Sequence, residues 1–139
     1  MGGSISVIGD SAFAYCTSLK EVKLPDSVDS LGTYVFSHCW AINTVSLPNG
    51  ISAIPDGCFF GCTRLQSVAF NASILSSVGT RAFSGCEYLE SLRLSTKIEY
   101  IGKYAFDECK NTVFTVSIDS YAHNWLVNNG VGSDNLKLD

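Results

Sequence analysis

The chain has 139 residues, of which 46% are hydrophobic and 16% are charged, and its formal net charge is −4 at pH 7. A chain of this length and composition is expected to bury a core without a metal or disulfides and to form one domain over residues 1–139. The negative charge argues against a nucleic-acid partner, because phosphate contacts need a basic surface. The chain has no apolar run of about 18 residues, so no transmembrane segment is expected.

A unit with a nearly fixed length recurs along the chain, and its first copy, IGDSAFAYCTSLKEVKL, runs from Ile8 to Leu24. A phenylalanine and, three residues later, a cysteine return at intervals of 23, 23, 24 and 23 residues. The phenylalanines are Phe13, Phe36, Phe59, Phe83 and Phe106, and the cysteines are Cys16, Cys39, Cys62, Cys86 and Cys109. A fixed period of about 20 to 29 residues is typical of a solenoid with one short strand per turn. We therefore expect about five repeats over residues 5–118.

Each repeat is predicted to form its strand shortly after the cysteine, where apolar and polar residues alternate. In the first repeat Val22 and Leu24 flank Lys23, which is the pattern of a half-buried strand. Prolines follow the first two strands and should end them, because proline has no N–H to donate to a ladder. In the fifth repeat we expect one extra residue, which places the inward positions of the strand at Val113, Val116 and Ile118.

The repeat pattern stops after Ile118, and residues 119–139 are predicted to form a C-terminal cap. Ser120 can cap a helix that begins with SYAHNWLVNNG, and Gly130 is suited to end it. The apolar residues of this segment share one face at helical spacing and are Tyr121, Ala122, Trp125 and Leu126. A helix here would cover the last repeat, as solenoid ends require. Beyond it, Leu136 and Leu138 could add a final strand.

The repeat resembles the short leucine-rich repeat of the treponemal or BspA-like type, whose pattern is LxxLxLPxxLxxIGxxAFxxCxx. Residues 19–42, LKEVKLPDSVDSLGTYVFSHCWAI, follow this pattern closely. The resemblance implies a right-handed leucine-rich repeat superhelix with a curved parallel β-sheet. It also implies a noncatalytic protein-interaction or adhesion module, of a kind found on the surface of bacteria or secreted by them, with no cofactor.

Two other functions stay open beside a protein-interaction module. The first is a carrier that binds a hydrophobic ligand through an exposed apolar surface, and the second is a structural spacer. The start of the chain has no cationic patch before an apolar run, so no signal peptide is expected in this sequence. The sequence has no motif for a hydrolase, a phosphate-binding loop or a zinc protease, so an enzyme is the least favoured class.

The outward-facing positions of the strands form the candidate binding face of the protein, which the resemblance implies to be concave. These positions are Glu21, Thr44, Ser67 and Ser91 in one row and Lys23, Ser46, Ala69 and Arg93 in the next. Thr115 and Ser117 are expected to continue the two rows. Lys23 and Arg93 are expected to be the only cations of the second row, and Arg93 to contribute more to binding, because arginine is enriched at hot spots.

The N-terminal end is predicted to be an open layer, because no strand precedes the first turn. The apolar residues expected to be exposed there are Ile5, Ile8, Phe13, Val22 and Leu24. A contiguous apolar surface tends to mark an interface or a ligand site. This end is therefore a second candidate site, for self-association or for a hydrophobic ligand.

The repeated cysteines are expected to be buried free thiols that act as small apolar side chains. A straight row of thiols cannot surround a tetrahedral metal, so no metal site is expected. Cys58 lies outside the row and is the one candidate for a disulfide, with Cys39 or Cys62. His38 adjoins Cys39, but neighbouring side chains tend to diverge, so we expect a surface histidine beside a buried cysteine and no catalytic dyad.

Overall fold

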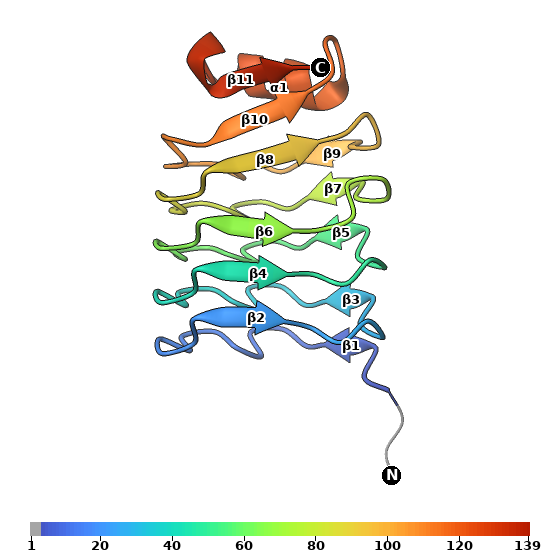
Figure 1. Ribbon diagram of the computed structural model, residues 1–139, viewed down its shortest axis with the longest axis vertical. Coiled ribbons are helices and arrows are strands. Elements are labelled where there is room, and N and C mark those ends of the chain that lie inside the picture. Colours follow the sequence, from blue (N-terminus) through green and yellow to red (C-terminus); the bar gives the residue numbers. More distant parts are fainter. Residues whose placement is uncertain (1–3) are drawn as a thin grey trace.

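The repeat folds into a stack of similar turns, each with a short strand, a tight turn and a longer strand (Figure 1). The computed structural model describes residues 4–139. The short strands are β1 (Val7–Ile8), β3 (Ser30–Leu31), β5 (Ala53–Ile54), β7 (Ser77–Val78) and β9 (Tyr100–Ile101). The longer strands are β2 (Glu21–Lys23), β4 (Thr44–Ser46), β6 (Ser67–Ala69), β8 (Ser91–Leu94) and β10 (Val113–Val116). The strand pairs are parallel, which confirms the predicted parallel solenoid.

The longer strands form the front of the stack in Figure 1, and residues one repeat apart pair directly. Val22 pairs with Val45 and Val45 with Val68, so equivalent side chains lie in rows. The expected single curved sheet is divided in two, with strand orders β2-β4-β6 and β11-β10-β8. The N–H of Glu90 still donates to the carbonyl of Gln66 at 3.0 Å, so the two sheets touch where β6 and β8 begin and separate along the strands.

The short strands form a second series of ladders behind the ladders of the longer strands. This second series is interrupted between a different pair of layers. β1 pairs with β3, and β5, β7 and β9 form one sheet, but β3 and β5 are not paired. Elsewhere the glycine after the short strand donates to the preceding layer, as Gly79 N does to the carbonyl of Ile54 at 2.8 Å. Pro55 occupies the equivalent position after β5 and has no N–H. The missing donor removes one of the bonds of this ladder, and the bond before the strand, from Ser52 N–H to the carbonyl of Asp29, is absent as well.

The tight turns hold neighbouring layers together through rows of three backbone hydrogen bonds. In the first turn the N–H groups of Ser11, Phe13 and Tyr15 donate to carbonyls of the second turn. The acceptors are the carbonyl oxygens of Thr33, Val35 and Ser37. The same arrangement recurs between the next layers, with N···O distances of 2.7–3.1 Å throughout. On this side of the stack, the N–H groups of each turn therefore point toward the C-terminal end.

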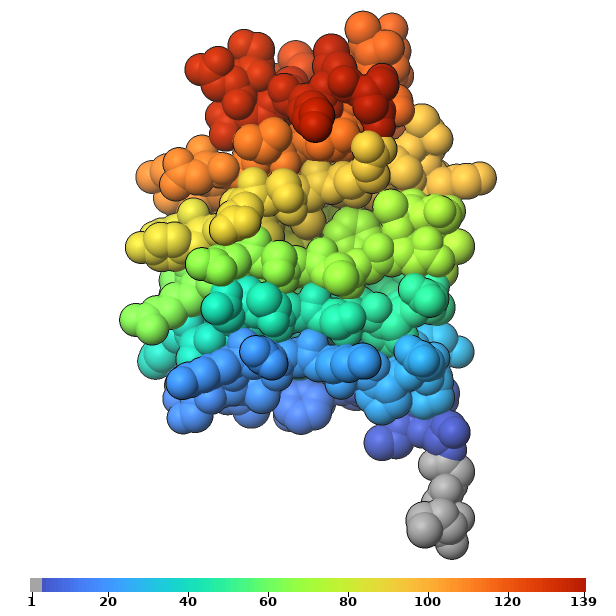
Figure 2. Space-filling model, viewed as in Figure 1, coloured from blue at the N-terminus to red at the C-terminus, as the bar shows by residue number. Residues whose placement is uncertain are grey.

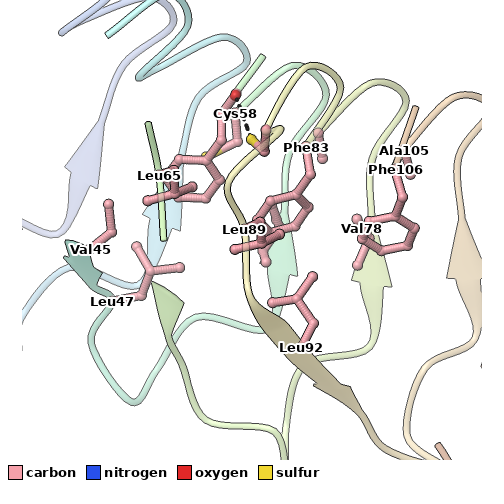
Figure 3. Close-up of a cluster of buried hydrophobic side chains, with 14 of the residues drawn as sticks. Val45, Leu47, Cys58, Leu65, Val78, Phe83, Leu89, Leu92, Ala105 and Phe106 are labelled. Atoms are coloured by element: carbon pink, nitrogen blue, oxygen red, sulfur yellow. Dashed lines mark hydrogen bonds between the residues drawn. The ribbon is translucent and has the colours of Figure 1, made fainter. Parts of the chain in front are cut away.

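The phenylalanines and cysteines of the repeat form the centre of the core, part of which is drawn in Figure 3. Neighbouring phenyl rings are stacked with centroids 5.3–5.7 Å apart, from Phe13 through Phe36, Phe59 and Phe83 to Phe106. Each thiol from Cys39 onward lies near the phenylalanine carbonyl of the preceding layer. Cys62 Sγ, for example, donates to the carbonyl of Phe36 at 3.0 Å. Each layer is thus joined to the next through rings, thiols and backbone groups.

The C-terminal cap contains the helix α1 (Tyr121–Asn128), a short 3-10 turn η1 (Ser133–Asn135) and β11 (Leu136–Leu138). The hydroxyl of Ser120 accepts from the N–H of His123, which confirms Ser120 as the helix cap. Trp125 packs edge-on against Phe106 with ring centroids 5.9 Å apart. The final strand β11 pairs with β10, so the predicted helix and the optional strand are both present.

The strand of the fifth repeat differs from the prediction. Phe114 pairs with Leu92 and Val116 with Leu94, so this repeat is one residue shorter before its strand and not one residue longer. Phe114 and Val116 are buried, whereas Ile118 is 63% exposed. Thr112 takes the buried position that Leu89 has in the fourth repeat, and its hydroxyl donates to the carbonyl of Leu89 at 2.8 Å.

Candidate functional site

The front face of β2, β4 and β6 brings together six of the eight residues predicted for the binding face. Their register places Glu21, Thr44 and Ser67 in one row and Lys23, Ser46 and Ala69 in the next. These side chains point away from the core and line a shallow open hollow. We call this surface the front face; Figure 2 shows its layers as successive bands from blue to green. Five of its six residues have polar side chains, and because the side chains are mostly short, the backbone or a flat surface of a partner protein could approach it closely.

A wider hollow adjoins the front face where the strands begin, and its residues were not among the predicted site residues. It has a volume of about 550 Å³ and is lined by Lys20, Glu21, Ala41, Asn43, Arg64, Gln66 and Tyr88. The repeat spacing could have indicated this hollow. Ser18, Ala41 and Arg64 occupy the same repeat position, and the small side chain of Ala41 leaves space beside Arg64. Among residues 4–139 the ion pairs involve neither Lys20 nor Arg64, so both cations are free to meet a ligand.

Arg93 and Ser91 lie on the other sheet, and the environment of Arg93 differs from the prediction. Its guanidinium forms an ion pair with the carboxylate of Asp139, which also accepts from the hydroxyl of Ser117. The guanidinium is the main cause of the lowered pKa of Asp139. Register places Thr115 and Lys137 beside Arg93, so Lys23 and Arg93 are not the only cations of this row.

The same register corrects the two expected continuations of the rows. Val113, not Thr115, pairs with Ser91 in the first row, and Thr115, not Ser117, pairs with Arg93 in the second. The front face is therefore a smaller site than the sequence predicts. Of the two cations predicted for its second row, it contains Lys23 and not Arg93.

The N-terminal end exposes part of the predicted apolar surface. Ile5 and Phe13 are exposed, at 60% and 37%, and Ile8 is half-buried. Val22 and Leu24 were expected to be exposed as well, but both are buried. Their own layer and the next one cover them, so the apolar surface at this end is narrower than predicted.

The six cysteines are free thiols, and five of them are buried. All six are free, so the candidate disulfide of Cys58 is not formed. Burial raises the pKa of the Cys62 and Cys109 thiols to about 12, which keeps them protonated. Between residues 4 and 139 no three histidine, cysteine or acidic side chains converge as metal ligands would.

His38 lies beside Cys39 in the chain but does not form a dyad with it. Its ring stacks on Tyr15 with centroids 4.7 Å apart, whereas the thiol of Cys39 donates to the carbonyl of Phe13. Cys39 is buried as expected, but His38 is half-buried against Tyr15 and Phe60 rather than on the open surface. In the described part of the chain, no helix combines the length and apolar character needed to cross a bilayer.

A parallel solenoid built from turns with the IGxxAFxxC pattern is a leucine-rich repeat architecture. A family model described as BspA type leucine-rich repeat region matches residues 1–121 in six copies, one more than the five repeats predicted. The chain belongs to the BspA-type leucine-rich repeat family. No curated protein sequence matches it.

Solved structures of bacterial leucine-rich repeat proteins have the same fold. One from Bacteroides ovatus is 29% identical over 82% of this chain and 29% of its own, with a TM-score of 0.75. The leucine-rich repeat protein of T. pallidum is 31% identical over 82% of this chain and 52% of its own, also with a TM-score of 0.75. One from Eubacterium ventriosum, 24% identical over 72% of this chain and 33% of its own, has a TM-score of 0.59 and shows the fold alone. The chain thus spans about half the length, or less, of these proteins.

Proposed function

We propose that the chain is a noncatalytic binding module that engages a protein partner through the front face. The observation that carries this proposal is the register of β2, β4 and β6, which aligns small polar side chains on one face. Beside them lie Lys20, Lys23 and Arg64, which form no ion pair within residues 4–139. Solenoids use extended faces of this kind to bind partners. By family resemblance, the module would act in adhesion on a bacterial surface or after secretion.

The chemistry of the front face favours a partner that approaches closely and carries negative charge. Ser46 and Ala69 leave a low floor between Lys23 and the edge of β6. Lys20 and Arg64 lie at the start of the strands, where a carboxylate of the partner would meet them. Glu21 lies among these cations and would select against a partner with a purely acidic surface.

The test is site-specific photo-crosslinking. A photoreactive amino acid at Ser46 should capture one protein from the surface fraction of the producing cells or of a host, and the same group at the exposed Tyr100, outside the front face, should not. Lys23→Glu should then weaken binding of the captured partner more than Arg93→Glu, because Arg93 is already paired with Asp139. Capture from Tyr100 alone, or equal effects of the two substitutions, would contradict the proposal.

The second candidate function is binding of an apolar ligand, or of another copy of the chain, at the N-terminal end. The observation that favours it is Phe13, which is 37% exposed although its four equivalents are buried. Phe13→Ser should abolish binding of a hydrophobic dye or concentration-dependent association if either occurs there. If the wild-type protein neither binds the dye nor associates, this candidate is wrong, and if it also lacks a crosslinked partner, a structural spacer becomes the better description.

A further inference from the structure

The last turn of the stack has a row of backbone donors that meets no acceptor. In every earlier turn, three alternate N–H groups donate to carbonyls of the next layer. The equivalent groups of the fifth turn belong to Tyr104, Phe106 and Glu108, and none of them has an acceptor within residues 4–139. The reason is topological, because the chain enters α1 after Ile118 and forms no further turn over this one.

These donors border a hollow at the C-terminal end of the stack. It has a volume of about 380 Å³ and is lined by residues of the fifth turn together with Trp125, Asn129 and Val131. A smaller hollow of about 150 Å³ adjoins it and extends toward Phe114. Phe106, Cys109, Lys110 and Val131 line both spaces, so a row of backbone donors faces a recess that has apolar side chains on part of its wall.

The charged residues around the hollow are two lysines and two acidic residues, and two of the four form an ion pair. Lys110 Nζ lies 3.0 Å from Glu108 Oε2. Lys103 lies over the ring of Tyr104, with Nζ 4.9 Å from the ring centroid. Asp107 is the remaining charged side chain of the lining. The site therefore offers backbone donors and apolar surface rather than a strong charge.

We propose that this hollow binds a peptide segment in the turn conformation of the repeat, whose alternate carbonyls accept from the N–H groups of Tyr104, Phe106 and Glu108. An apolar side chain of the segment would enter the recess between Phe106, Val131 and Phe114. The strongest support comes from the protein itself, because four equivalent donor rows each bind three alternate carbonyls at 2.7–3.1 Å. Binding here continues an interface that the fold already uses at every layer.

Other occupants fit the site less well. A small anion would reach only one or two of three donors that are spaced for alternate residues of a chain. A second copy of the protein would have to bring a whole layer past α1 and β11, which stand over the rest of this end (Figure 1). A single peptide turn needs only the hollow. The site lies at the end of the stack, so it is separate from the front face and independent of the function proposed for that face.

The test uses amide resonances of the whole protein and a synthetic probe. The probe is the blocked nonapeptide of residues 32–40, with serine in place of the cysteine, because this segment accepts the equivalent row in the folded chain. Adding it should shift the amide signals of Tyr104, Phe106 and Glu108 and slow their hydrogen exchange. A probe with ester bonds after the residues equivalent to Thr33, Val35 and Ser37 has weaker acceptors and should bind less tightly.

A matched pair of variants separates the site from the rest of α1. Asn129→Trp fills the hollow and should weaken binding of the probe at least about tenfold. Asn128→Trp changes the neighbouring exposed residue, which does not line the hollow, and should leave binding unchanged. The unfolding midpoints of both variants establish that each is folded.

Several results would overturn the proposal. One is the absence of shifts at probe concentrations of about 1 mM. A second is a set of shifts confined to residues 9–16, which would place the probe at the opposite end. Loss of binding in the folded Asn128→Trp variant would also count against the hollow. Finally, the same three amides shifting with protein concentration alone would assign the row to a second copy.

Discussion

Phe59→Ala should be among the most destabilising single changes in the chain. Phe59 is fully buried and stacks on both sides, with ring centroids 5.7 Å from Phe36 and 5.3 Å from Phe83. Emptying a buried phenylalanine site typically costs about 3–5 kcal/mol. Each lost aromatic pair adds about 0.5–1.5 kcal/mol beyond burial, so we expect a loss near the upper end of that range, about 5 kcal/mol.

Phe13→Ala provides the matched control at the same repeat position. Phe13 is 37% exposed and stacks on one ring, that of Phe36 at 5.6 Å. It loses less buried area and one aromatic pair instead of two, so its substitution should cost about half as much, roughly 2 kcal/mol. The two costs should differ although the two residues occupy the same position of the repeat.

Urea denaturation of both variants, followed by far-ultraviolet circular dichroism, measures the two free energies of unfolding. A loss below about 1 kcal/mol for Phe59→Ala would show that the stacked rings do not hold the layers together. Equal losses for the two variants would refute the reasoning from burial and stacking. An unfolding transition with two steps in Phe59→Ala would show instead that the two halves of the stack had become independent.

Three further predictions concern the glycines, the thiols and the helix cap. A Cβ on Gly79 would clash with the backbone nitrogen of Asp56, whereas nothing lies within 4 Å of one on Gly9. Thermal melts should therefore show Gly79→Ala strongly destabilised and Gly9→Ala nearly unchanged. The pKa values of the Cys62 and Cys109 thiols in the folded protein, at about 12, exceed that of an unfolded thiol. The stability that these two thiols contribute is therefore fully present below about pH 8.5 and is lost as the pH rises toward 12. Urea titrations at increasing pH should show this decline, and Cys62→Ala should make it less steep; a pH-independent stability would contradict it. Ser120→Ala removes the acceptor for His123 N and should cost about 1 kcal/mol by calorimetry, while Ser133→Ala, at a residue whose hydroxyl makes no hydrogen bond within the described chain, should cost little.

The core of the fold was predictable because the repeat encodes it five times. The spacing of the phenylalanines and cysteines defines equivalent layers, and equivalent residues of a solenoid must lie in rows. The rows of the front face up to β6 follow from the same spacing, and the register of Glu21, Thr44 and Ser67 agrees with it.

The fifth repeat was mispredicted because a buried polar residue was mistaken for a surface one. Thr112 occupies a position that is apolar in the other repeats and satisfies its hydroxyl with the carbonyl of Leu89. A search for the next apolar residue passes over Thr112 and selects Val113, which shifts the predicted strand by two residues, so that Val116 faces inward in both registers but pairs with Leu94 instead of Leu92. The alternation of Phe114 and Val116 was the available signal for the correct register.

The environment of Arg93 and the division of the front sheet could not be read from the repeat. Asp139 lies outside the repeat pattern, so its ion pair with Arg93 depends on how β11 returns to β10. The separation of β6 from β8 coincides with the one interval of 24 residues, whose extra residue lies after β6 and before β7, but the spacing does not say which ladder this residue interrupts. Both features arise from contacts between layers rather than within one.

The two interruptions of the sheets have a mechanical consequence, because they lie between different layers. The short-strand ladder is interrupted between β3 and β5, where β4 and β6 are still paired. The long-strand ladder is interrupted between β6 and β8, where β5 and β7 are still paired. No plane through the stack therefore crosses two interruptions, and the donor rows of the turns span both levels. A force that pulls the ends of the stack apart meets a continuous ladder at every level, so the protein should rupture as one piece and not shed its layers in turn.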